Sequence, residues 1–209
     1  MKRILLMAVM AVAVSVVSAQ GLGLRGGVNM SNFAGDGMED TKMLTGFHLG
    51  LDYEIAVAPD FYFAPGLLFS TKGAKDEWSE DGGTIEAKTI LNYLEVPLNL
   101  VYKPLLGEGN LIVAFGPYLG YGIGGKNKME FSGGGASASI EEDVNFGSGD
   151  EDNFKALDMG ANISFGYMFA GGLSIQLNTQ LGLINISPSE DDADAVKNTG
   201  FGLGLGYRF

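Results

Sequence analysis

The chain ends with Gly200-Phe-Gly-Leu-Gly-Leu-Gly-Tyr-Arg-Phe209, and this stretch decides the fold. Side chains of an extended strand point alternately to its two faces. One face of the stretch carries only large apolar side chains, whereas the other carries Gly202, Gly204, Gly206 and Arg208. A soluble sheet packs its apolar face on a core and turns polar side chains to water. A face of almost bare backbone instead indicates a crowded interior, as in the closing strand of a barrel whose apolar outside meets lipid.

Seven earlier segments repeat this alternation of apolar with small or polar residues. Lengths of about ten residues are typical of strands that cross an outer membrane. The pattern predicts eight strands, at residues 22–31, 46–57, 61–70, 89–102, 110–124, 157–169, 172–183 and 200–209. Pro65, Pro97 and Pro117 lie inside three of them, where each removes a hydrogen-bond donor from the ladder. We expect bulges or locally broken pairing at these prolines.

The connections between the segments are alternately long and short: 32–45, 58–60, 71–88, 103–109, 125–156, 170–171 and 184–199. An up-and-down barrel with both ends in the periplasm requires this alternation, because its periplasmic turns are short and its outer loops long. Outward-facing aromatic residues also gather at the two expected rims, as in the aromatic belts of membrane proteins. The periplasmic belt is predicted to hold Phe61, Tyr102, Tyr167, Phe169, Tyr207 and Phe209, and the outer belt Phe47, Phe69, Tyr121 and Phe201. We therefore predict an all-β fold, an eight-stranded antiparallel up-and-down transmembrane β-barrel.

Composition supports this placement and excludes other classes of protein. Residues 1–19 have the pattern of a signal peptide, with Lys2 and Arg3 before an apolar run and small residues at 17–19, which leaves 20–209 as the barrel domain. No later segment has 18 consecutive apolar residues, so we expect no membrane-spanning helix. The net charge of −12 argues against binding nucleic acid, and the absence of cysteine excludes disulfides and thiol-ligated metals. The expected location is the outer membrane of a diderm bacterium.

Six short motifs carry a resemblance to a known family. They are Gly26-Gly-Val-Asn-Met-Ser31, Gly46-Phe-His-Leu-Gly50, Ser70-Thr-Lys-Gly73, Tyr93-Leu-Glu-Val-Pro-Leu98, Gly116-Pro-Tyr-Leu-Gly-Tyr121 and the terminal Gly204-Leu-Gly-Tyr-Arg-Phe209. In their order and spacing, the chain after residue 19 resembles the PorT-like family of small outer-membrane β-barrel proteins. The resemblance implies an eight-stranded barrel in the outer membrane. The member that names the family is associated with protein secretion and gliding machinery, and nothing in this sequence singles out that role.

Charged residues on the inward face are the first candidate site. Arg25, Glu54 and Arg208 fall toward the periplasmic ends of strands that are neighbours in a closed barrel, and Glu95 falls nearer the middle. An eight-stranded barrel is just wide enough for side chains to fill it. We expect these four residues to form a structural ion cluster inside the barrel, in which Arg25 or Arg208 contacts Glu54.

An enzymatic alternative rests on His48, the single histidine. A lipid hydrolase needs a histidine that activates a serine, and Ser70 falls at the same rim on the next strand. No local motif marks a nucleophile, and lipid would have to reach an inward face. The sequence therefore favours a protein without catalytic residues, metal or cofactor. A narrow conduit for small solutes is the third interpretation.

The outer loops hold the remaining candidates. Trp78 lies among acidic residues in the second loop, where it can contact a partner. The acidic runs 141–143, 150–152 and 190–194 have oxygen ligands for divalent cations, but they lack the spacing of a calcium-binding EF-hand loop, so a solvated charge run is the expected state. The terminal Phe209 matches the C-terminal aromatic residue that resemblance to outer-membrane barrels associates with recognition by the barrel assembly machinery.

The expected function is that of a structural or adhesive scaffold. Loops on a rigid scaffold are where binding functions concentrate. We expect the barrel to contact outer-membrane lipid and its four outer loops to bind an envelope or extracellular protein. In addition, the family resemblance implies that this scaffold is linked to envelope protein secretion.

Overall fold

The computed structural model describes residues 21–35, 38, 41–80, 83–133, 136–147, 152–188 and 195–209. The predicted signal peptide, residues 1–19, lies outside the described residues. The strands are β1 (Leu22–Ala34), β2 (Lys42–Tyr53), β3 (Ile55–Ala58), β4 (Phe61–Glu80), β5 (Gly83–Tyr102), β6 (Leu105–Leu106), β7 (Gly109–Gly133), β8 (Ala136–Asp143), β9 (Leu157–Met168), β10 (Leu173–Gly182) and β11 (Lys197–Arg208). Within these ranges, helices of the length and apolarity needed to cross a membrane do not occur.

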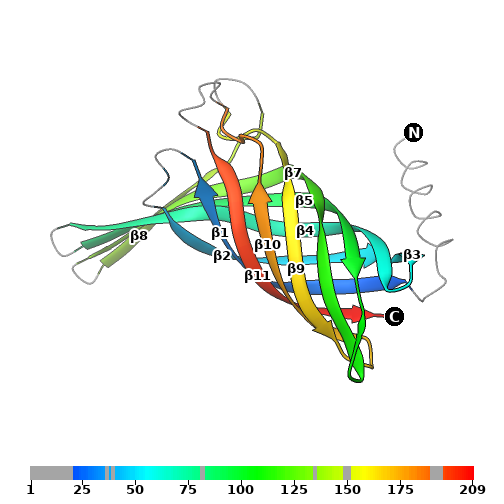
Figure 1. The fold of residues 1–209 in the computed structure, drawn as a ribbon. Helices are drawn as coiled ribbons and strands as arrows, with labels where there is room; N and C mark the ends of the chain where they lie inside the picture. The colour runs from blue at the N-terminus through cyan, green and yellow to red at the C-terminus, as the bar shows by residue number, and fades with distance from the viewer. Residues whose placement is uncertain are drawn as a thin grey trace, which may run out of the picture.

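Eight of these strands form a closed antiparallel ring, as the sequence predicted (Figure 1). The order is β2-β1-β11-β10-β9-β7-β5-β4, and pairing between β2 and β4 completes the ring. The terminal strand β11 closes the sheet against β1, in a register that runs from Gly23–Arg208 to Ala34–Lys197. The short strand β3 continues β2 after Glu54 and also pairs with β4. The C-terminal stretch is therefore the closing strand.

The outer surface of the ring is a band of exposed apolar side chains, typical of a lipid-facing surface. Ile163 and Leu205, for example, are 55% and 58% exposed. Aromatic neighbours contact one another at both rims: Phe61–Tyr102 at 4.6 Å between ring centroids, Tyr167–Phe169 at 5.2 Å, Tyr207–Phe209 at 5.0 Å and, at the other rim, Phe47–Phe69 at 5.4 Å. Both predicted aromatic belts are thus represented by contacting pairs.

The prolines interrupt the ladder without changing its register. Pairing between β4 and β5 runs to Pro65–Leu98 and resumes in the same register at Leu68–Glu95. Pairing between β5 and β7 stops likewise at Pro97. The register shifts lie elsewhere, between Met43 and His48, Ala56 and Ala58, and Asn92 and Tyr93. Broken pairing at these two prolines is confirmed, whereas the bulges are found at other positions.

Two outer connections were wrongly predicted as loops. The second, 71–88, is mostly strand, because β4 runs on to Glu80 and β5 begins at Gly83. The third, 125–156, contains the end of β7 and all of β8. These segments carry Lys and Glu on one face, and a lipid-facing strand does not tolerate charge there. Above the membrane that restriction disappears, so the strands continue with charged residues on their outer face.

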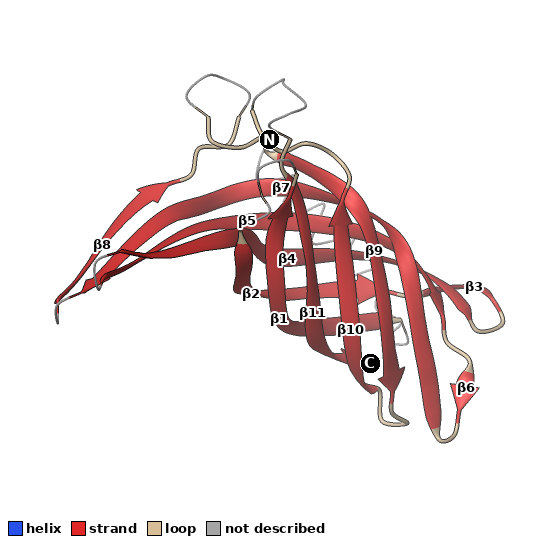
Figure 2. Cartoon of the chain, turned by 60° about the vertical axis from the view of Figure 1, so that its left-hand side comes forward, coloured by secondary structure: helices blue, strands red, loops and turns tan. Residues whose placement is uncertain are grey.

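The strands that continue form a sheet that projects beyond the ring, past the ends of β1, β10 and β11 (Figures 1 and 2). We call it the outer extension. It consists of β8 and the ends of three ring strands, residues 75–80 of β4, 83–89 of β5 and 126–133 of β7, in the order β4-β5-β7-β8.

Candidate functional site

The glycine face of β11 provides room for side chains from neighbouring strands. A Cβ atom at Gly204 would lie 3.0 Å from His48 Nε2, and one at Gly206 would lie 2.7 Å from Ser174 Oγ. At Gly202 it would lie 2.5 Å from the amide oxygen of Asn178. The glycines therefore admit polar side chains into the lumen, and these side chains belong to the interior network described next.

A first group of charges fills the periplasmic end of the lumen. Arg208 Nη2 lies 2.9 Å from Glu54 Oε1 and 2.5 Å from Asp52 Oδ1, and Arg208 Nη1 donates to the Gly21 carbonyl at 2.8 Å. The other carboxylate oxygen of Glu54 pairs with Lys103, whose ammonium lies 4.5 Å from the centroid of the Tyr62 ring. We call Asp52, Glu54, Lys103 and Arg208 the periplasmic ion cluster. The predicted contact with Glu54 is thus made by Arg208.

A second group of charges is buried nearer the outer end. Lys72 Nζ lies 2.8 Å from Glu95 Oε1 and 3.0 Å from Asp158 Oδ2, and all three side chains are almost completely buried. We call these three residues the central ion cluster. The remaining oxygen of Glu95 accepts from Gln180 at 2.8 Å, and Asp158 accepts from Asn198 at 3.0 Å.

Aromatic rings complete the environment of Lys72. Its ammonium lies 4.3 Å from the centroid of the Tyr118 ring and 5.4 Å from that of Tyr93. The Tyr118 hydroxyl also donates to Asp158 at 3.3 Å. Buried ions are tolerated when opposite charges and hydrogen bonds offset their desolvation, and these contacts supply both kinds of partner.

The structure therefore divides the four predicted lumen ions between two places. Glu54 and Arg208 are in the periplasmic ion cluster, and Glu95 is in the central ion cluster. Arg25 lines a cavity of about 40 Å³ beside Asp52, Glu54 and Arg208, and it is within electrostatic range of Glu95. With Arg25, four cationic side chains face four carboxylates in the lumen. Among the described residues, the two clusters are thus electrically balanced only when Arg25 is included.

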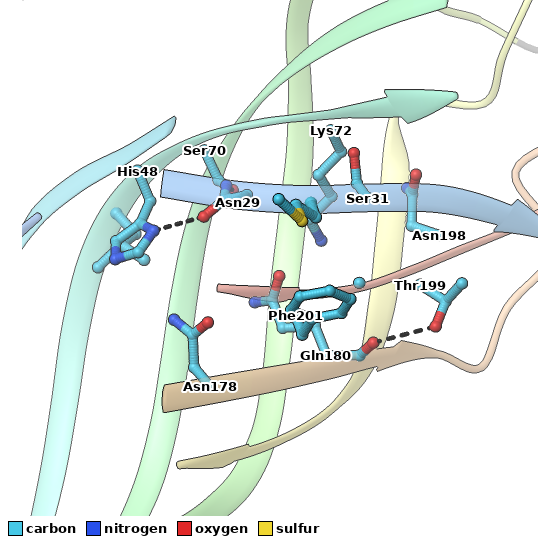
Figure 3. A pocket seen from close by; sticks show the side chains of 13 residues that line it. Asn29, Ser31, His48, Ser70, Lys72, Asn178, Gln180, Asn198, Thr199 and Phe201 are labelled. Atoms are coloured by element: carbon cyan, nitrogen blue, oxygen red, sulfur yellow. Dashed lines mark hydrogen bonds between the residues drawn. The ribbon is translucent and has the colours of Figure 1, made fainter. Parts of the chain in front are cut away.

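His48 is held by an asparagine (Figure 3). His48 and Ser70 are directly opposite on β2 and β4. However, His48 Nδ1 lies 2.5 Å from Asn29 Oδ1, and Asn29 Nδ2 donates to Ser70 Oγ at 3.2 Å. Both His48 and Ser70 are buried. The arrangement places an amide between the two groups that a hydrolase would couple, and the adjoining cavity is about 30 Å³.

An apolar cluster covers the outer mouth of the barrel. It comprises the buried residues Phe33, Ala74, Leu91, Tyr93, Val144, Ile186 and Val196, with Met38, Phe146 and Phe154 packed against them. Backbone bonds hold these loop segments in place, among them Lys155 N to Ile186 O at 2.7 Å and Ile186 N to Val196 O at 2.8 Å. We call this group the outer cap. Parts of the first, third and fourth outer loops therefore close the barrel.

The outer extension has two unlike faces. Residues directly opposite in neighbouring strands point to the same side of a sheet. One side has the rows Trp78–Ile85–Phe131–Ala138 and Asp76–Ala87–Met129–Ile140. We call it the apolar face. The other, the charged face, has ion pairs between strands: Lys42–Glu77, Lys75–Glu86, Lys88–Glu130, Lys126–Glu141 and Lys128–Glu141.

Polarity is inverted where the strands leave the ring. Strand β5 runs without a break from Gly83 to Tyr102, so its odd-numbered residues share one face. Below the rim that face carries Glu95 in the lumen, and above the rim it carries Ile85 and Ala87 on the apolar face. The opposite face changes from lipid-exposed Leu94 to Lys88 and Glu86. The charged face thus continues the lipid-facing surface into water.

Hydrogen-bonded lysines dominate the electrostatics of the charged face. Lys128 and Lys88 lower the pKa of the Glu130 carboxyl to about 2. Lys88 and Lys75 likewise hold the pKa of Glu86 below its usual value. Glu141, which was considered as a cation ligand, lies 2.9 Å from Lys126 Nζ. Asp150, Glu151 and the acidic run 190–194 lie outside the described residues.

Sequence reasoning missed Lys72, Lys103 and Asp158 as members of the ion clusters. Lys72 follows Ser70 by two residues and so shares its inward face, but the strand was expected to end at Ser70. Lys103 was placed in a turn. Asp158 lies inside the predicted strand 157–169, but it was not included among the candidate lumen ions. Trp78, which was predicted to be in a loop, lies on β4 and is 44% exposed.

A closed ring with a lipid-facing band and a filled lumen defines a small outer-membrane β-barrel. A family model described as "Outer membrane protein beta-barrel domain" matches residues 4–209, and the chain belongs to this family. The sequence comparison with curated proteins gives no match.

Several solved outer-membrane proteins are similar to this chain. Ail, the attachment invasion locus protein of Yersinia pestis, is 20% identical over 91% of this chain and 99% of its own, with a TM-score of 0.41. Neisserial surface protein A is 12% identical over 90% and 97%, with a TM-score of 0.44. The outer membrane enzyme PagL is 11% identical over 90% and 99%, with a TM-score of 0.39.

Proposed function

We propose that the protein is a non-enzymatic outer-membrane scaffold that holds the outer extension above the membrane to bind a protein partner. The observation that carries this proposal is the apolar face of the extension. Trp78 and Ile140, which are 44% and 57% exposed, lie above the lipid-facing band, so lipid does not cover them. Large exposed apolar patches on proteins are typical of interaction sites.

The contents of the lumen argue against the two alternatives. The central ion cluster and the outer cap fill the path that a solute would follow. In the enzymatic alternative, His48 would have to activate Ser70, but Asn29 occupies the hydrogen-bonding position between them. Lipid substrate would also have to pass the apolar band to reach these buried groups. We therefore propose that the lumen is structural.

The partner is proposed to be an envelope or extracellular protein. The resemblance to PorT-like proteins supports a link to envelope protein secretion, in which a membrane scaffold presents a docking surface. Trp is among the residues that contribute most to protein interfaces. Each lysine of the charged face is paired with a glutamate, so this face has little charge left for a polyanion.

A truncated barrel tests the proposal. Residues 76–87 and 129–140 are each replaced by Asn-Gly, which forms a two-residue hairpin turn. The wild-type and truncated barrels are cross-linked in living cells, and the captured envelope proteins are compared. We expect truncation to abolish a specific cross-link. The double variant Trp78→Ser and Phe131→Ser should do the same, whereas Lys88→Gln with Glu130→Gln on the charged face should retain it. A cross-link that survives truncation contradicts the proposal.

A further inference from the structure

We propose that the partner supplies an extended segment that pairs with the free edge of β8, with side chains that alternate between apolar and basic. This inference rests on the proposed function and specifies how the outer extension binds. Strand addition to an exposed sheet edge is a common mode of peptide recognition, in which main-chain hydrogen bonds contribute much of the affinity.

The first observation is an edge without a partner strand. Within the described ranges, each ring strand has neighbours on both sides along its transmembrane part, whereas β8 pairs with β7 alone. Residues 137–143 of β8 are all exposed. An unpaired edge presents backbone N–H and C=O groups that can template another strand.

The second observation is that the outer half of β8, residues 136–140, lacks the usual protection of an edge. Natural edge strands are commonly blocked by lysine, proline, bulges or inward-pointing charges. Residues 136–140 contain no charged residue or proline, and the pairing of β8 with β7 has no register shift. Ser137, Ala138 and Ser139 are small and leave the backbone accessible. At the opposite edge of the extension, β4 is protected by Asp76, which points to the apolar face.

The third observation is that the apolar rows end at β8. Ala138 ends the row that begins at Trp78, and Ile140 ends the row that contains Met129. Side chains directly opposite in antiparallel strands lie about 5 Å apart. An added strand would place its own apolar side chains beside Ala138 and Ile140, so that the apolar face would extend over a fifth strand.

Charge specifies the chemistry of the added segment. Strand β8 ends with Glu141, Glu142 and Asp143. Glu141 and Asp143 lie on the charged face, where an added strand that keeps its apolar side chains beside Ile140 would place its other side chains. Glu141 pairs with Lys126 and Lys128, whereas Asp143 has no ion pair among the described residues. The whole chain has a net charge of −12, which disfavours a second copy of it as the partner. Basic side chains that alternate with apolar ones complement this edge.

Synthetic peptides test the inference on the full barrel in detergent micelles. The probe is a peptide of about ten residues that alternates valine and lysine. One control replaces each lysine with glutamate, and another carries N-methyl groups on alternate residues, which remove hydrogen-bond donors but keep the side chains. We expect the valine–lysine peptide to slow amide hydrogen exchange across residues 137–143 by about tenfold. The glutamate peptide should bind at least about tenfold more weakly, and the methylated peptide should give no protection.

Matched variants locate the binding edge. Ser139→Pro on β8 should abolish the peptide's effect. Ser79→Pro should retain it, because Ser79 lies on β4, at the opposite edge of the extension. The two variants are matched because both serines lie on the charged face. Ala138→Lys, which places a charge at the end of an apolar row, should also block binding. Circular dichroism and native gel mobility check that the ring is folded in each variant.

Several results would overturn the inference: equal binding of the lysine and glutamate peptides, an absence of protection in β8, or dimerisation through β8 without peptide. The cross-link formed in living cells distinguishes a failure of the strand-addition inference from a failure of the proposed scaffold function. A cross-link lost on truncation but unaffected by Ser139→Pro rejects strand addition and leaves the scaffold function in place. A cross-link unaffected by both changes rejects both proposals.

Discussion

The ring and the outer extension are made of the same strands, but they have opposite polarity. Within the membrane, apolar residues such as Leu177 face outward and ions such as Lys72 face inward. Above the rim, ions such as Lys88 face outward and apolar residues such as Ile85 face inward. Strands β4 and β5 pair without a register shift across the rim, so in these strands the medium against the outer face decides which side is apolar. A buried ion and an exposed ion of the same type should therefore differ greatly in their energetic effect.

Lys72→Met should produce the largest effect. It leaves Glu95 and Asp158 buried side by side without a counter-ion. Loss of one partner of a buried ion pair costs about 3–5 kcal/mol. The matched change Lys128→Met on the charged face should cost far less, because exposed pairs contribute little. Urea unfolding in lipid vesicles measures both, and equal losses would contradict the distinction between the regions.

The outward faces of the two regions give the next prediction. Leu177 lies near the middle of β10 and is 57% exposed to the lipid side. Leu177→Lys should lower the free energy of unfolding by about 2–4 kcal/mol, the range for lysine near the bilayer midplane. Ser139→Lys on the charged face of β8 should change it by less than about 0.5 kcal/mol. A similar loss for both variants would mean that the charged face also contacts lipid.

The C-terminal residue offers a kinetic comparison. Phe209 is exposed, and its backbone N–H donates to Leu22 O at 3.0 Å. We predict that Phe209→Ser lowers the amount of barrel assembled in cells several-fold while changing the free energy of unfolding by less than about 0.5 kcal/mol. Tyr207→Ser, which affects the same aromatic belt, is the control. Equal assembly of the Phe209 variant and the wild type would remove the proposed assembly role.

Much of the fold followed from the sequence, because alternation within a lipid-facing strand is strict. A one-residue shift in register would place ions such as Glu95 in lipid, so the pattern determines both the strand and its faces. The same rule failed at Lys75 and Lys88, which lie on the outer face of β4 and β5 but fell within the predicted loop 71–88. The division of the lumen ions into two clusters depended on Lys72 and Lys103, which lie just beyond the predicted strand ends. The outer cap depended on loop contacts, such as Phe33 with Phe154, that have no periodic pattern.

The smallest expected effect concerns the pH response of the charged face. The pKa of Glu130 is lowered from 4.5 to about 2 by Lys128 and Lys88. A carboxyl whose pKa is lower in the folded state stabilises that state above its unfolded pKa, and this contribution is lost as pH falls from about 4.5 toward 2. The side chain is exposed, so salt should screen the effect.

NMR titration in micelles should give a Glu130 midpoint near 2, and Lys128→Gln should move the midpoint toward 4.5. The ring should stay folded over this range, because the change is confined to exposed pairs of the outer extension. A Glu130 midpoint that stays near 4.5 in the wild type would mean that the pairs of the charged face open freely in water.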